Sequence, residues 1–417
     1  MLNRHSLWSI AGGAIPALAA VVSIPLMISA LGFELFAITS LIISVTIFFY
    51  VYDLGMSRTM TFLISKIEQD NSKPEDDLIG TAFISALVLG LFVTAIVYIF
   101  APYFAKYWMK IDRNLLDEAV LAFQVSVLGI LPGVLSNTFK GILEGKSKFK
   151  ESNICKIFSG ASVFIAPMIV IALESKNLVH ISAAIVLTRY LSLILYAIYT
   201  TRLSSLLFIK VRRKHLQSIW NYGVWAALSG LISTTFVYGD RFLVAGYLSS
   251  QDLSVYIASQ DVLIRYLLIP WSMAIVLMPT FSADNIAKIK VFELYRLQQK
   301  RVALISFIIL LLVLFLALCI ARFINHPAIP ENVEYVAAIQ MVGIFFCAMS
   351  QLPLIYLYGK GMPRLITNIY LAELLIYILI APMIFSYFGI VGACFVWSGR
   401  LVIEYFLLRY YTERLIR

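Results

Sequence analysis

Long apolar segments dominate this chain and restrict it to a membrane fold. Of its 417 residues, 61% are hydrophobic and 13% are charged, whereas a soluble protein carries about 25% charged residues. A membrane-spanning helix needs about 20 mostly apolar residues. Twelve segments meet this requirement: 8–31, 36–64, 79–103, 118–140, 153–173, 182–203, 222–246, 253–281, 300–322, 336–358, 366–387 and 390–411. The sequence therefore predicts an all-α polytopic membrane protein.

Lysine and arginine residues place both termini in the cytoplasm. In membrane proteins these residues collect in cytoplasmic loops. With the N-terminus inside, most of the 33 Lys and Arg residues fall in cytoplasmic segments or at the adjoining helix ends. The outer side holds only Lys106, Lys110, Arg113, Lys176 and Arg322. This bias accounts for the net charge of +10 without a nucleic-acid partner.

A basic segment at 204–219 separates six predicted helices from another six. We therefore divide the chain into an N-terminal six-helix bundle over residues 1–205 and a C-terminal six-helix bundle over residues 206–417. The first apolar run, 8–31, is longer than the apolar region of a signal peptide, which has about 7–15 residues. We expect it to be an uncleaved transmembrane helix.

Ten charged residues lie inside the predicted spans, where each costs roughly 2.5–3.5 kcal/mol on insertion scales. Such residues usually face a bundle interior or a water-filled path, so they predict transport of something polar. A guanidinium fork matches phosphate oxygens, and the candidates for binding an anionic cargo are Arg58, Arg189, Arg241, Arg265 and Arg400. Carboxylates that could couple transport to protons or Na⁺ are Asp53, Asp240, Asp261, Glu373 and Glu404.

The spacing of these charges separates pairs from isolated groups. Asp261 and Arg265 lie four residues apart, as do Arg400 and Glu404. Positions i and i+4 share a helix face, so each pair can neutralise itself. A structural ion pair and a polar cavity wall both remain open, and the cost of burial favours the cavity wall. Arg265 lies nearest the centre of its span and is the leading phosphate contact.

The remaining charges have no same-face partner in their own span. Asp53 and Arg58 are five residues apart and point roughly 140° away from each other on an ideal helix, with Gly55 between them. Arg189 and Glu373 are isolated in their spans. A lone carboxylate such as Glu373 can bind and release a proton.

No signature of a catalytic, metal or cofactor site is present in the sequence. The segment 141–147 resembles a phosphate-binding P-loop, but it has three residues between its glycines where the motif needs four. It also follows a predicted transmembrane helix instead of a strand. We find no metal-ligand cluster and no nucleophile elbow, so we expect a transporter without a cofactor, and not an enzyme.

Several short patterns resemble polysaccharide flippases of the Wzx type, which belong to the multidrug/oligosaccharidyl-lipid/polysaccharide exporter superfamily. They are Tyr-Gly-Asp-Arg-Phe-Leu-Val at 238–244, Arg-Tyr-Leu-Leu-Ile-Pro at 265–270, Asp-Leu-Gly at 53–55 and Leu-Glu-Gly-Lys at 143–146 followed by Phe149. Their order and spacing cover nearly the whole chain. Ala37 departs from the pattern, because the family often has glycine there.

The resemblance implies two six-helix bundles around a central cavity that is often cationic. It implies a cargo of oligosaccharide on undecaprenyl diphosphate, moved across the bacterial inner membrane in contact with lipids and other polysaccharide assembly proteins. Two alternatives stay open. A multidrug antiporter of the same superfamily would carry cations, against which the arginines argue. A membrane polysaccharide polymerase generally has a large outer loop, and the longest one here, about 103–117, is short.

Overall fold

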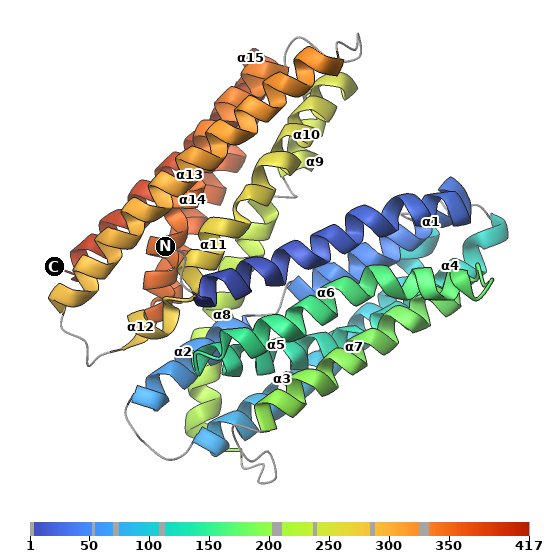
Figure 1. Cartoon of the computed structure of the whole chain (residues 1–417), viewed down its shortest axis with the longest axis horizontal. Coiled ribbons are helices and arrows are strands. Elements are labelled where there is room, and N and C mark those ends of the chain that lie inside the picture. Colours follow the sequence, from blue (N-terminus) through green and yellow to red (C-terminus); the bar gives the residue numbers. More distant parts are fainter. Residues whose placement is uncertain are drawn as a thin grey trace. The chain divides into compact units, whose positions relative to one another are not determined.

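Helices make up the regular structure of the described part of the chain, which contains no strand. Figure 1 shows the computed structural model, and the residues that it describes are 4–51, 55–69, 75–107, 113–201, 211–236, 240–283, 288–324 and 333–416. The chain divides into two compact units, Met1–Ala227 (unit 1) and Leu228–Arg417 (unit 2). The all-α prediction is confirmed. The bundle boundary predicted at 205/206 lies outside the described residues and stays a prediction.

Unit 1 is a bundle in which α1 packs along α6, α2 along α5, and α6 along α7 (Figure 1). The first part of α8 also belongs to this unit. Its helices are α1 (Arg4–Val51), α2 (Met56–Gln69), α3 (Glu75–Tyr107), α4 (Arg113–Val127), α5 (Ile130–Gly145), α6 (Phe149–Ala172), α7 (Leu178–Thr201) and the start of α8 (Arg213–Thr234).

Unit 2 is built around α14, which packs against α10, α11, α12, α13 and α15. Its helices after α8 are α9 (Asp240–Ala245), α10 (Ser250–Tyr266), α11 (Leu268–Ile275), α12 (Met278–Ser282), α13 (Lys288–Ile324), α14 (Val333–Gly359) and α15 (Pro363–Ile416). The helix α15 contains a non-helical residue, Gly389, with φ of 54°. It therefore covers both of the last two predicted spans as two limbs.

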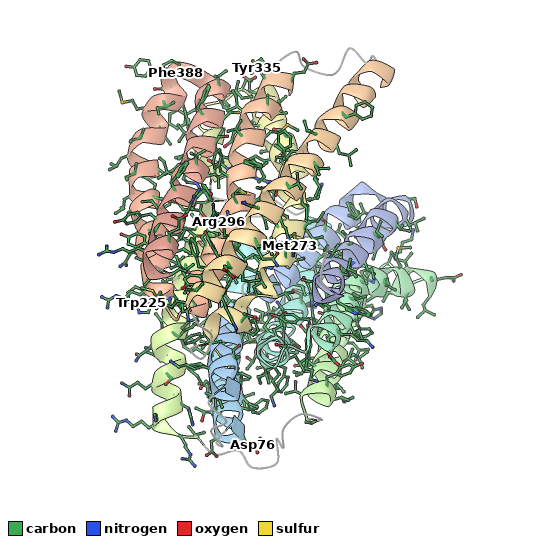
Figure 2. The ribbon with its side chains drawn as sticks, turned by 60° about the vertical axis from the view of Figure 1, so that its left-hand side comes forward. Asp76, Trp225, Met273, Arg296, Tyr335 and Phe388 are labelled. Carbon is green, nitrogen blue, oxygen red and sulfur yellow. The ribbon has the colours of Figure 1, made fainter. Side chains whose placement is uncertain are left out.

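The outer surface of the helices is apolar, as a lipid environment requires. Leu379 is 77% exposed and Phe388 is 67% exposed on α15. Figure 2 shows Phe388 and Tyr335 near the same end of unit 2, where aromatic side chains suit a membrane interface. Among the described residues, seven helical segments are long and apolar enough to cross a membrane, judged by length and composition. The polytopic membrane fold predicted from the sequence is confirmed.

Several predicted continuous spans are interrupted in the described part of the chain. The span 36–64 is divided between the end of α1 and α2, the span 118–140 between α4 and α5, and the span 253–281 among α10, α11 and α12. At the first break Gly55 has a φ of 74°, a conformation that glycine adopts without steric cost. Apolar composition predicts that a segment crosses the membrane, and it does not report such breaks.

Candidate functional site

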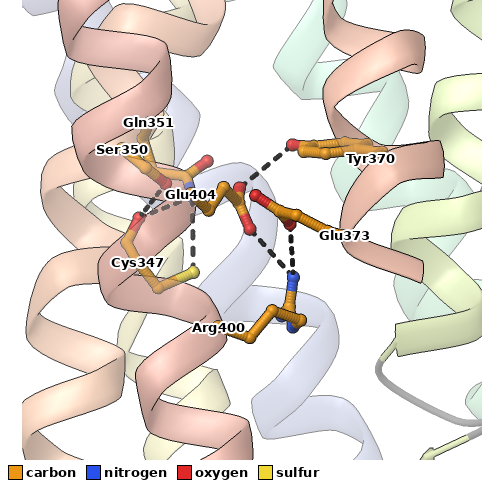
Figure 3. A network of polar contacts seen from close by, with 7 residues as sticks. All are labelled: Cys347, Ser350, Gln351, Tyr370, Glu373, Arg400 and Glu404. Carbon is orange, nitrogen blue, oxygen red and sulfur yellow. Dashed lines mark hydrogen bonds and ion pairs between the residues drawn. The ribbon is translucent and has the colours of Figure 1, made fainter. Parts of the chain in front are cut away.

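A cluster of buried charges in unit 2 surrounds the guanidinium of Arg400. Its Nη1 atom lies 3.0 Å from Oε2 of Glu404 and 3.4 Å from Oε2 of Glu373. The hydroxyl of Tyr370 donates a hydrogen bond of 3.1 Å to Oε1 of Glu404. Figure 3 shows the two carboxylates converging on the guanidinium. One nitrogen therefore serves two acidic side chains.

The two limbs of α15 supply this cluster. Tyr370, Glu373 and Tyr377 lie three and four residues apart and so share one face of the first limb. Arg400 and Glu404 share one face of the second limb, beyond the bend at Gly389. The bend brings a carboxylate and a guanidinium together across 27 residues of sequence.

A second buried carboxylate, that of Asp240, is surrounded by neutral donors. Its Oδ2 atom accepts hydrogen bonds from the hydroxyl of Tyr256 at 2.6 Å and from Nε2 of Gln260 at 3.3 Å. Its Oδ1 atom accepts a hydrogen bond from the hydroxyl of Tyr377. Tyr256 and Gln260 are four residues apart on α10, so they approach Asp240 from one helix face.

An aromatic side chain links the two carboxylate sites. The ring of Phe236 lies 3.9 Å from Cζ of Arg400, a distance that gives a cation–π contact. The same ring meets Tyr377 edge to face, with ring centroids 5.9 Å apart. Phe236 follows α8 in a short π-helical turn at 235–236, and such turns often occur at functional sites. Asp240 and Arg400 are thus parts of one polar network in an apolar bundle.

The arginines of unit 1 lie elsewhere and make different contacts. Arg189 on α7 is buried, and its Nη1 atom donates a hydrogen bond of 2.8 Å to Oγ of Ser159 on α6. Arg58 on α2 is partly buried, with Nη1 3.5 Å from the carbonyl oxygen of Ala226 on α8. Both guanidinium groups therefore tie helices of unit 1 together.

The other predicted site residues divide by exposure. Arg265 is exposed in the last turn of α10, whereas Arg241 is partly buried in α9. Asp53 lies outside the described residues, and so does the side chain of Asp261. Among the described residues, the structure brings together the predicted charges Glu373, Arg400 and Glu404, with Asp240 beside them.

Sequence reasoning missed the neutral side chains of this network. Tyr370 and Tyr377 flank Glu373 at helical spacing, and that stripe is a readable signal. The contacts of Tyr256 and Gln260 with Asp240 were harder to predict. The only sequence signal is that the two residues share one face of α10, the helix that follows Asp240. The contact between Glu373 and Arg400 had no signal in the spacing, because it depends on how α15 bends.

The family assignment rests on a match that covers most of the chain. A family model described as "Polysaccharide biosynthesis protein" matches residues 27–326. The chain belongs to this family. The recognised resemblance to polysaccharide flippases is confirmed.

A relative matches the chain along almost its whole length. A Shigella flexneri protein described as a candidate O-antigen transporter is 25% identical to it over 416 residues, covering 99% of this chain and 98% of the relative. The likeness therefore extends through both units.

Solved transporter structures share the fold of this chain. A transporter of the MOP superfamily from Pyrococcus furiosus superposes with a TM-score of 0.81 at 15% identity, covering 99% of this chain and 94% of that one. A multidrug resistance MATE family transporter in an outward-facing conformation gives 0.82 at 15% identity, with the same coverage. A structure of MATE in the straight conformation gives 0.84 at 15% identity, covering 99% of this chain and 95% of that one. The protein has a multi-pass transporter fold.

Proposed function

We propose that this protein is a flippase for undecaprenyl-diphosphate-linked oligosaccharides. It moves repeat units of O-antigen or a similar surface polysaccharide from the cytoplasmic to the outer leaflet of the bacterial inner membrane, without enzymatic chemistry. The observation that carries the proposal is the likeness, over 99% of the chain, to a relative described as a candidate O-antigen transporter. The movement occurs by alternating access, driven by an ion gradient.

Arg265 is the proposed first contact of the cargo diphosphate. It is exposed, and it lies where the predicted span 253–281 is interrupted between α10 and α11. Transporter binding sites are typically formed by such discontinuous helices. Arg58 and Arg241 are proposed as further contacts. Arg189 and Arg400 would first have to exchange the Ser159 and carboxylate partners that they hold in this structure.

Five carboxylates are proposed as the groups that couple transport to protons or Na⁺. Asp240, Glu373 and Glu404 lie in the buried network of unit 2. Asp53 and Asp261 are proposed from the sequence alone.

A second candidate function is export of a cation by antiport, as in multidrug transporters. The excess of carboxylates over guanidinium groups around Arg400 favours it. The two candidates differ in cargo charge. Deleting the gene would trap lipid-linked repeat units in the inner leaflet under the first proposal, and would sensitise cells to cationic drugs under the second.

Substitution of Arg265 tests the cargo contact. Losing charge-assisted hydrogen bonds to phosphate, each about 1.5–3 kcal/mol, should lower polysaccharide export about tenfold or more in Arg265→Ala. Arg265→Lys should retain part of the export, because lysine supplies the charge without the fork. Export is measured per molecule of protein in the membrane, in a deletion strain complemented with each variant. Arg296→Ala is the matched control, because Arg296 is exposed on α13 outside the predicted span 300–322.

Asp261 could complicate the result, since alanine at position 265 would leave that carboxylate without the partner expected four residues away. The double variant Asp261→Asn with Arg265→Ala removes this problem. Normal export by the double variant, at normal protein level, would contradict a role for Arg265 in holding the cargo.

A further inference from the structure

Two buried carboxylates of unit 2, those of Glu373 and Glu404, contact the one guanidinium of Arg400. The side chains of Glu373, Glu404 and Arg400 are only 5%, 8% and 10% exposed. If both carboxylates were ionised, the three side chains would carry a net negative charge in an apolar bundle. An isolated buried charge is strongly disfavoured, and the group usually becomes neutral instead.

The geometry places both acidic groups against the same cation. Both Oε2 atoms contact the same Nη1 atom of Arg400, at 3.0 Å for Glu404 and 3.4 Å for Glu373, so a charge on one carboxylate disfavours a charge on the other. Two carboxylates that share a site cannot both ionise readily. The outer oxygens differ, because Oε1 of Glu404 accepts a hydrogen bond from Tyr370, while Oε1 of Glu373 is buried with no hydrogen-bond partner among the described residues.

We propose that Glu373 and Glu404 share one exchangeable proton beside Arg400, and that this pair is the ion-coupling site of unit 2. The inference rests on the proposed function only where it links proton exchange at this pair to movement of the cargo. The step is an acid–base exchange. The O–H bond of one carboxylic acid breaks, the proton passes to water on the side then accessible, and the bond re-forms with a proton from the other side. No electrons are transferred.

The ligand of this site is a proton and not a metal cation. Arg400 already occupies the position between the two carboxylates that a metal ion would need. Within the described residues, no group of three or more His, Cys, Asp or Glu side chains is arranged to hold a metal. A guanidinium stays protonated at any physiological pH, so it acts as a permanent internal counter-ion.

Other ionisable groups also lie around the pair. Cys347 on α14 and Tyr370 on α15 interact with Arg400. Tyr358 on α14 interacts in turn with Tyr370. Asp240 on α9 interacts with Arg400, but its own oxygens are met by Tyr256, Gln260 and Tyr377. Asp240 therefore stands outside the shared-proton pair.

The same helix offers a matched pair for comparison. Arg409 and Glu413 have the same four-residue spacing as Arg400 and Glu404, with Nε to Oε1 at 2.7 Å. Their side chains are 46% and 28% exposed, so water can stabilise the ionised carboxylate. One carboxylate there meets one guanidinium, and no proton is needed for balance.

Infrared spectroscopy of the purified full-length protein in lipid nanodiscs tests the proposal without any cargo. Exposed carboxylic acids lose their protons near pH 4, roughly, so a protonated carboxyl C=O band that persists at neutral pH reports a buried acid. Wild-type protein should show this band and lose it at alkaline pH. Glu373→Gln and Glu404→Gln should each abolish the band, because one carboxylate then balances Arg400. Glu413→Gln and Asp240→Asn should keep it.

Three results would overturn the proposal: no band in the wild type at neutral pH, a band that survives in both glutamine variants, or a band lost only in Asp240→Asn. If Glu404→Gln is not monodisperse, Glu373→Gln alone decides, because its carboxylate oxygen has the longer contact with Arg400. Coupling has its own readout. In vesicles, cargo movement by Glu373→Gln should no longer respond to a pH gradient, whereas a response to Na⁺ alone would contradict the proton assignment.

The two proposals fail separately. A missing infrared band with normal cargo movement removes the proton site and leaves the flippase. An intact band with no cargo movement removes the flippase and leaves the proton site.

Discussion

Single residues in unit 2 show how neutral hydrogen-bond donors hold a carboxylate in an apolar bundle. Asp240 is 3% exposed and accepts hydrogen bonds from Tyr256, Gln260 and Tyr377. A hydrogen bond to a charged group contributes about 1.5–3 kcal/mol to stability. Removing one donor leaves a buried acceptor without a partner, and this costs more free energy for a charged acceptor than for a neutral one. These three neutral side chains therefore stabilise the carboxylate of Asp240.

Tyr256→Phe should lower the midpoint of thermal unfolding, because Asp240 loses a donor at 2.6 Å while the packing of the ring is kept. The same change in an Asp240→Asn background should have a smaller effect, since the charge that the hydroxyl stabilises has been removed. Both are measured by thermal unfolding in detergent. Equal effects in the two backgrounds would show that the hydroxyl does not act through Asp240.

Residue spacing predicted part of this site. The contact between Arg400 and Glu404 follows from positions i and i+4 on a helix, and the structure contains it at 3.0 Å. The contact of Glu373 with Arg400 depends on the bend at Gly389, which composition does not encode in a readable way. The cargo contacts proposed for the five arginines stay predictions.

At the scale of elements, the membrane-crossing segments are interrupted at defined residues. Gly55 separates α1 from α2, with φ of 74°, and it lies against the backbone of α8. A Cβ atom there would lie 2.7 Å from the amide nitrogen of Ala227 and 2.7 Å from the carbonyl oxygen of Gly223. Hydropathy predicts the apolar segment correctly. The break at Gly55 could not be predicted in this way, because it depends on contact with α8, which is far away in the sequence.

Gly55→Ala should destabilise the protein by more than the backbone conformation alone explains. An L-residue in a left-handed conformation costs roughly 1–2 kcal/mol, and the clash with α8 adds to this. Gly399→Ala is the control for the added methyl group, because no atom lies within 4 Å of an added Cβ there. Thermal unfolding should show a larger loss for Gly55→Ala. Equal losses would mean that α2 and α8 are not in tight contact.

For the whole molecule, hydropathy and charge were sufficient to predict the class of fold. Apolar segments long enough to span a bilayer, together with the lysine and arginine bias, gave a polytopic helical protein, and the structure and its relatives confirm it. The same reasoning could not name a sugar or an ion, because those depend on side chains brought together by the fold.

The topology makes a direct prediction. Reporters fused after Lys73, Lys150, Lys214, Lys290 and Arg417 should all report the cytoplasm, because the basic segments stay inside. Alkaline phosphatase and fluorescent-protein fusions measure this in cells. A periplasmic signal at the C-terminus would require a different number of spans.

The most direct test of the central claim is a leaflet assay on the purified protein. Undecaprenyl-diphosphate-linked oligosaccharide is placed in proteoliposomes, and a membrane-impermeant reagent that cleaves the glycan measures how much reaches the exposed leaflet under a pH gradient. A flippase should raise the accessible fraction well above that of protein-free vesicles, and Arg265→Ala should reduce the rate about tenfold or more. An accessible fraction equal to that of protein-free vesicles, with correctly inserted protein, would contradict the proposed function.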